Sequence, residues 1–273
     1  FRLSVTLAGA RLATEGGHAL STPRLEAVAA AYRPDRWTFR LPEGFTLERP
    51  LVGPTRVTGR LMRGSVSATD RLPRIAVEGR ELTFTPAGGA VLFPLASAGR
   101  VDFALQSRPE GPDEAGVLLR IENAVAAPGT LLQRIGGDPK GRLVWEGVLS
   151  QAGALRGSGW SGLVRNWAQT GGEMRVLQGE AAVGEASAKV ERGRLTVGGD
   201  GRLRGELDLS VRRGPRALLE LRGAPRITPE AATAAAAIAE AREENQTARL
   251  PLVFEAGVVT VGPVALAPAL KVY

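Results

Sequence analysis

GRLTVGGDGRLRGELDLSV, residues 193–211, is the stretch of this sequence that decides the fold class. In its second half, apolar or small residues alternate with polar ones, the period of two typical of an antiparallel strand with one buried face. Asp200-Gly201 supplies the positive φ angles that a tight hairpin turn requires. The stretch therefore predicts a β-hairpin. The residues of the expected inner face are Leu203, Gly205, Leu207, Leu209 and Val211.

Similar short alternating runs, separated by turn residues, occupy most of the 273-residue chain. Several of them begin with Gly-Arg-Leu, as at residues 59–61 and 141–143, which we interpret as a turn, an outward Arg and an inward Leu. We predict one mostly β domain over residues 1–273, with a candidate internal seam at residues 136–141. Its expected form is a curved antiparallel meander sheet, an open trough or half-barrel.

Two segments have a helical signal. Residues 21–32 fit either a helix opening at Pro23 or an alternating strand, and the alternation favours the strand. Thr228 can cap a helix that begins at Pro229 and continues through an Ala-rich run to about Gln246. We expect this Ala-rich helix to be the single clear helix of the chain and to serve as a lid or brace.

So many amphipathic strands expose a long apolar face, and the sequence predicts little helix to cover it. A wide twisted sheet usually curls or splits into two packed layers. If the layers pack fully, the result is a closed sandwich. If they stay apart, the apolar face must be covered by something else, and an acyl chain fits.

The amino-acid composition limits the classes of binding partner and of chemical site that the chain can have. The net charge is +7, almost all from arginine, which suits phosphate-bearing partners or reflects only a GC-rich genome. Aromatic residues are 5%, few for a single-stranded nucleic-acid platform, so no nucleic-acid partner is predicted. The chain has no cysteine, which excludes disulfides and thiolate sites, and His18 alone cannot supply a metal triad. We predict no enzyme, cofactor or metal.

Residues 157–162 match the G-x-G-x-x-G pattern, but Trp160 lies inside it, the segment that follows has room for only about two helical turns, and the rest of the chain is a meander. We therefore expect a loop. Trp37 and Trp145 lie on apolar faces and are predicted to be core. Around the Gly-rich loop, two tryptophans accompany two arginines, and together they are candidates for head-group or membrane-interface contacts. These candidates are Arg156, Trp160, Arg165 and Trp167.

No apolar run approaches the ~18–20 residues of a membrane-spanning helix. The chain begins at Phe1, already within an alternating strand. We therefore expect a leader or N-terminal anchor to precede it, which would place the domain outside the cytoplasm.

The C-terminal part resembles a family of uncharacterised, membrane-anchored periplasmic proteins of alphaproteobacteria. The resemblance rests on Asn166-Trp167, Gly171-Gly172-Glu173, the phrase from Gly193 to Gly205, and residues 250–270. The family's usual Trp-Gly pair appears here as Val183-Gly184. The general sequence pattern is also similar to that of AsmA-type envelope proteins. That similarity implies a curved sheet with an apolar groove and a role in moving lipids between membranes.

The sequence thus predicts a periplasmic lipid-binding or lipid-transfer protein that holds an acyl chain in an apolar β groove with a basic rim. The expected partners are an anionic or amphiphilic lipid, the inner-membrane surface and other envelope transport proteins. The alternative is a non-enzymatic structural or assembly module of the envelope with a closed sandwich core. The candidate lining residues, chosen by face parity, are Leu207, Leu209, Val211, Leu219, Leu221 and Phe254.

Overall fold

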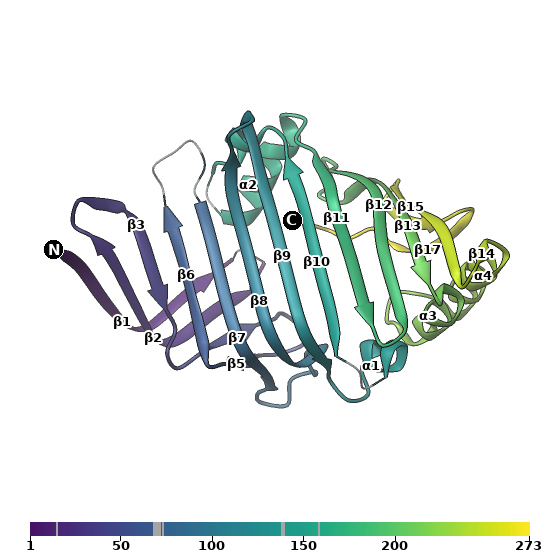
Figure 1. The fold of residues 1–273 in the computed structure, drawn as a ribbon, viewed down its shortest axis with the longest axis horizontal. Coiled ribbons are helices and arrows are strands. Elements are labelled where there is room, and N and C mark those ends of the chain that lie inside the picture. The colour runs from purple at the N-terminus through teal and green to yellow at the C-terminus, as the bar shows by residue number, and fades with distance from the viewer. Residues whose placement is uncertain (15, 68–71, 73, 138–139, 158) are drawn as a thin grey trace.

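The structure is a computed structural model, and it describes residues 1–14, 16–67, 72, 74–137, 140–157 and 159–273 (Figure 1). The strands are β1 (Arg2–Ala13), β2 (Ala19–Ala30), β3 (Arg33–Arg40), β4 (Phe45–Glu48), β5 (Thr55–Thr58), β6 (Leu61–Ser67), β7 (Arg74–Pro86), β8 (Leu95–Arg108), β9 (Gly111–Ala126), β10 (Gly141–Leu149), β11 (Met174–Val183), β12 (Ala186–Val197), β13 (Leu203–Arg212), β14 (Glu243–Glu244), β15 (Thr247–Glu255), β16 (Val258–Val261) and β17 (Val264–Pro268). The helices are α1 (Leu131–Gly136), α2 (Gly159–Gln169), α3 (Gly214–Glu220) and α4 (Pro229–Ala241), with 3-10 turns at Ala152–Ala154 and Leu221–Gly223.

Among the described residues, all 17 strands belong to one sheet, and each pairs antiparallel with its neighbours. From β6 to β13 every strand pairs with the next one along the chain, which is a meander. The hairpin read from residues 193–211 is confirmed, with Val197 opposite Leu203 and Gly201 at a φ of +78° in the turn. The predicted open, mostly β meander is therefore confirmed.

At two positions in the sheet, a pair of short strands takes the place of one long strand. Strands β3 and β4 both lie along β2, and β5 and β6 both lie along β7. The segment from Leu41 to Gly44 separates β3 from β4, and Gly59-Arg60 separates β5 from β6. The neighbouring strands β7, β8 and β9 are unbroken, so they must bend at the same level.

Positive φ angles mark this level in the neighbouring strands. Glu81 in β7 has a φ of +51°, and Asn123 in β9 has a φ of +52°. The registers place Glu81 opposite Gly99, and Gly99 opposite Asn123, so the kinks align across the sheet. Gly9 in β1, with a φ of +63°, lies at the same level. We call this line of kinks, from Gly9 to Asn123, the crease.

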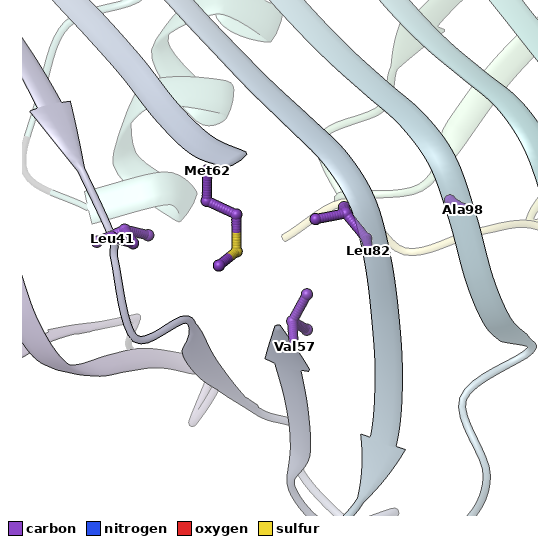
Figure 2. Packing of buried hydrophobic residues seen from close by; sticks show 5 residues of the cluster. All are labelled: Leu41, Val57, Met62, Leu82 and Ala98. Atoms are coloured by element: carbon purple, nitrogen blue, oxygen red, sulfur yellow. The ribbon is translucent and has the colours of Figure 1, made fainter. Parts of the chain in front are cut away.

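The crease changes which side chains face inward. In the part of β7 that pairs with β6, Ile75 and Val77 face the apolar side. In the part next to β5, on the other side of the crease, Leu82 and Phe84 face that side. Side chains from both parts meet in one buried cluster, in which Val57, Met62 and Leu82 point toward one another (Figure 2). The sheet is thus folded along the crease toward its apolar side.

The helices pack against this same side of the sheet. Ala235 and Ala239 of α4 contact Leu250 of β15, and Trp167 of α2 clusters with Val197 of β12. In Figure 1, α2 lies at the upper ends of the long central strands and α1 at the lower ends of β11 and β12. The helices therefore lie around the apolar side, mainly at its ends, and within the described part of the chain no helix covers its middle.

Several local expectations are resolved. Residues 21–32 fall largely in β2, as the alternation favoured. The Thr228 cap is confirmed, since its Oγ1 accepts a hydrogen bond from the Ala231 N–H at 3.2 Å. The Ala-rich helix ends at Ala241, not near Gln246, because residues 243–244 form a short strand on β15. The candidate seam at 136–141 includes residues 138 and 139, which lie outside the described residues; β9 and β10 pair directly on either side of it.

The expectations of a loop at 157–162 and of a single helix were wrong. Helix α2 begins at Gly159, inside the Gly-rich motif. Its inward face is formed by Val164 and Trp167, which are buried. Helix α3 begins after Arg213, whose φ of +55° turns the chain out of β13, with Pro215 in the first turn.

The molecule has more surface than its mass requires. Its accessible surface is 15312 Å². A closed monomer of 28.7 kDa exposes about 11,300 Å², so the chain exposes about a third more. This is what a sheet with an uncovered face is expected to show.

Candidate functional site

The apolar side of the sheet carries two continuous rows of apolar residues and glycines, which we call the apolar face. The first row runs from β1 to β15 through Val5, Ala27, Phe39, Gly64, Val77, Phe103, Leu119, Trp145, Gly179, Val190, Leu209 and Leu250. The second runs from β1 to β16 through Leu3, Ala29, Trp37, Val66, Ile75, Leu105, Val117, Gly147, Val176, Gly193, Leu207, Leu252 and Val261.

Many of these side chains remain partly open to solvent. Leu3, Val5 and Val77 are 40–44% exposed, and Phe103, Leu119 and Trp145 are half-buried. A contiguous apolar surface of this extent is uncommon on a monomeric protein and marks a binding surface. The apolar face is therefore the first candidate functional feature.

Glycines allow the large side chains to lie flat on this face. A Cβ at Gly64 would lie 2.3 Å from the Phe39 ring, and a Cβ at Gly179 would lie 2.5 Å from Val190 and 3.3 Å from Trp145. The neighbouring side chains thus lie over the glycine backbone, as aromatic residues do at glycines in other sheets. The result is a smooth floor.

A pocket of about 490 Å³ opens on the apolar face at its α1 end; we call it the apolar pocket. Its floor includes Ile121, Leu143 and Ala188, and Leu132 and Ile135 of α1 form part of its wall. Its volume falls within the ~300–1,000 Å³ of small-molecule sites, and its lining is almost entirely hydrocarbon.

A second pocket of about 490 Å³ adjoins it, between α1, α3 and the β11–β12 turn. The two pockets share Ile135, Ala186 and Ala217 in their linings. The second pocket also contains three arginine side chains, and we call it the arginine pocket. Its arginines are Arg134, Arg213 and Arg216, and its carboxylate is Glu185.

The opposite, charged face carries larger but shallower hollows. The hollow of about 1330 Å³ over β11–β15 is lined by four arginines and four carboxylates, which balance. Farther along, Arg63 and Arg80 each donate a hydrogen bond of 2.7 Å to Glu78, and these bonds hold the pKa of Glu78 below its ordinary value. Ion pairs of this kind, partly open to solvent, are typical of a charged protein surface.

The predicted lining residues fall into two groups. Leu207 and Leu209 lie in the two rows of the apolar face, and Val211 lines the apolar pocket. Phe254 lies opposite Gly205 and continues the alternation of Leu250 and Leu252 in β15, and it also contributes to the lining of the hollow over β11–β15.

Two of the predicted lining residues are not on a strand at all. Leu219 belongs to α3 and Leu221 to the 3-10 turn that follows it. Their choice by strand parity is therefore corrected, because the chain turns into a helix at Gly214-Pro215.

The predicted head-group residues gather around α2, at the far end of the strands from α1 (Figure 1). Arg156 and Arg165 are exposed, and the Arg165 guanidinium lies 5.3 Å from the Tyr273 ring centroid. Trp160 is 54% exposed and donates from Nε1 to the Val272 carbonyl at 2.7 Å.

Trp167, in contrast, is 5% exposed and donates from Nε1 to the Ser150 carbonyl at 2.7 Å. It is a core residue that holds α2 on the sheet, so it cannot contact a head group from this position.

The sequence reading missed the arginine pocket. Its side chains come from α1, the β11–β12 turn and α3, three segments that only the fold brings together. The available signals were local: Leu131, Leu132 and Ile135 have helical spacing, and Pro215 follows a glycine at the end of a strand.

Within the described ranges, no group of three or more His, Asp or Glu side chains is placed to hold a metal ion. In the same part of the chain, none of the helices combines the length and the hydropathy that a membrane crossing needs.

Comparison with known proteins gives one match. No curated protein and no solved structure matches the chain. A family model described as "Uncharacterized protein conserved in bacteria (DUF2125)" matches residues 1–269. Because this match covers nearly the whole sequence, the chain belongs to this bacterial family.

Proposed function

We propose that the chain is a lipid-binding or lipid-transfer protein that holds an acyl chain against its apolar face. The observation that carries this proposal is the pair of apolar rows crossing the sheet, whose middle is not covered by any helix among the residues that the structure describes. Burial of hydrocarbon on such a surface contributes about 0.8 kcal/mol per methylene, so one chain lying along several strands would be held firmly.

The smooth floor supports the same use. A floor made of glycine backbone and flat aromatic rings, such as Phe39 over Gly64, has few projecting side chains to fix a rigid ligand. A flexible acyl chain needs only continuous apolar contact. The chain would bind and release its lipid unchanged, so the proposal includes no catalytic step.

We propose further that the protein works in the bacterial envelope, on the periplasmic side, tethered near the inner-membrane surface and handing lipid to or from other envelope transport proteins. Membership of a bacterial family agrees with this, and the resemblance to membrane-anchored periplasmic and AsmA-type proteins motivates it.

The first experiment is mass spectrometry of organic extracts from protein purified without detergent, together with its native mass. We expect lipid in stoichiometric amount. A clean mass of the protein alone, with no uptake from added phospholipid vesicles, would instead favour a structural module working through protein contacts.

A matched pair of variants then locates the lipid. Leu118 and Leu119 are adjacent in β9, and both are half-buried, but they face opposite sides of the sheet. Leu119 lies between Phe103 and Trp145 on the apolar face, and Leu118 lies between Ala104 and Glu146 on the charged face. We expect Leu119→Glu to abolish lipid uptake and Leu118→Glu to preserve it, with both variants folded by circular dichroism. Equal uptake by both variants would remove the apolar face as the site.

A further inference from the structure

The apolar pocket and the arginine pocket form one continuous site with two kinds of wall. Ile135, Ala186 and Ala217 line both of them, so hydrocarbon contacts lead directly into a region of guanidinium groups. The arrangement matches an amphiphile, with its tail on one side of this boundary and its head on the other.

The charges of the arginine pocket are only partly balanced. Arg213 pairs with Glu185, and Arg134 Nε lies 3.5 Å from Glu220 Oε2. Arg216 is exposed and has no carboxylate within ion-pair distance among the residues described. The pocket lining thus has three arginines against one glutamate, whereas the hollow over β11–β15 on the charged face has equal numbers.

The backbone around the pocket is fixed by close packing. A Cβ at Gly184 would lie 2.2 Å from the Gly136 carbonyl oxygen, and a Cβ at Gly136 would lie 2.2 Å from Val183 Cγ2. The end of α1 is therefore seated directly on the β11–β12 turn. This contact keeps Arg134 on one side of the pocket and Glu185 on another.

Resting on the proposed function, we propose that this end of the apolar face is the seat of an anionic phospholipid, with its phosphate in the arginine pocket and an acyl chain in the apolar pocket. Planar guanidinium groups bind phosphate oxygens through paired, charge-assisted hydrogen bonds. A pocket of about 490 Å³ with arginines from two helices has more room and charge than a bare carboxylate uses, which favours a phosphate head group.

The test uses vesicles of equal parts phosphatidylglycerol and phosphatidylcholine with identical acyl chains. The protein is incubated with them and re-isolated, and its bound lipids are quantified by mass spectrometry. We expect phosphatidylglycerol to be enriched roughly tenfold, because both lipids carry a phosphate but only phosphatidylcholine adds a cationic choline, which the arginines would repel.

The double variant Arg213→Gln/Arg216→Gln should bind both lipids with an enrichment of about twofold or less, because the charges that select phosphatidylglycerol are gone. The matched control is Arg56→Gln/Arg249→Gln, which removes two exposed arginines from the charged face and should keep the wild-type ratio. Arg216→Gln alone, an exposed change that should not disturb folding, is expected to give an intermediate ratio.

The outcomes separate the two proposals. If the wild-type protein takes up neither lipid, the proposed function itself fails and the seat fails with it. If it takes up both lipids equally, or if the double variant keeps the wild-type enrichment, lipid binding stands and the site for an anionic phospholipid is overturned. A loss of enrichment in the Arg56/Arg249 control as well would assign the selectivity to net charge and overturn the seat.

Discussion

Filling the apolar pocket from its floor should weaken lipid binding without harming the fold. Ala181 lies in β11 between Leu143 and Ala188, lines the apolar pocket, and is exposed. A tryptophan at this position can lie over the pocket floor without displacing buried side chains. Ala181→Trp is therefore expected to occupy the space that the acyl chain would use.

The expected loss of lipid affinity is calculated from the apolar area that the tryptophan covers. A tryptophan side chain covers about 150–250 Å². At roughly 25 cal/mol per Å², the lipid would lose about 4–6 kcal/mol of apolar contact. A displaced chain can slide along the open face and recover part of this. We therefore expect a loss of about 3 kcal/mol, which corresponds to roughly a hundredfold weaker binding.

The assay is titration with a pyrene-labelled phospholipid, with thermal unfolding measured on the same samples. The matched control is Ala76→Trp, at an exposed alanine of β7 that lines a hollow of the charged face. The control should bind as wild type. Ala181→Trp should melt at the wild-type temperature or above, since the indole covers exposed apolar surface.

Wild-type affinity in Ala181→Trp would refute the reasoning, because it would mean that the lipid does not use the apolar pocket. A similar loss in Ala76→Trp would refute it as well, since the effect would then not depend on the face of the sheet.

Three further expectations concern the fold and are measured by urea denaturation. Gly44→Ala should lower the free energy of unfolding by about 3 kcal/mol or more, because Gly44 has a φ of +79° and its new Cβ would lie 2.3 Å from the Val57 carbonyl oxygen. A loss below about 1 kcal/mol would contradict this packing. Glu81→Gly should be neutral or stabilising by up to about 1 kcal/mol, since glycine relieves the positive φ at the crease; a large loss would show that the Glu81 side chain is needed there. Trp167→Phe should cost about 1–3 kcal/mol, because it leaves the Ser150 carbonyl without its indole donor, and an unchanged midpoint would argue against that bond.

Alternation alone was sufficient to predict the class of fold. It placed Leu207 and Leu209 on the apolar face, because a strand with one buried face repeats every two residues. The crease was beyond this reasoning. Glycine at position 9 or 99 and asparagine at position 123 are compatible with a bend, but Glu81 adopts a positive φ that its residue type does not favour, and no local signal predicts it.

The candidate site was less predictable than the sheet. Strand parity failed for Leu219 and Leu221, because Pro215 and the left-handed Arg213 start a short helix within a run that also reads as a strand. The arginine pocket depends on Arg134 and Arg216 coming together across 82 positions of sequence. Such a meeting is a property of the register of the whole meander, which a single sequence does not specify.

The crease also has a mechanical consequence. An open sheet lacks a second layer to resist curling, and a wide twisted sheet tends to roll up. A straight fold in a thin plate resists bending of the plate along the direction of the fold, so a crease that runs across the strands opposes rolling of the sheet. The crease crosses the strands from Gly9 to Asn123 and ends beside the register shift between Gly141 and Leu143. Such a crease opposes rolling in this half of the sheet, and it does not extend to the strands where α1 and α3 lie.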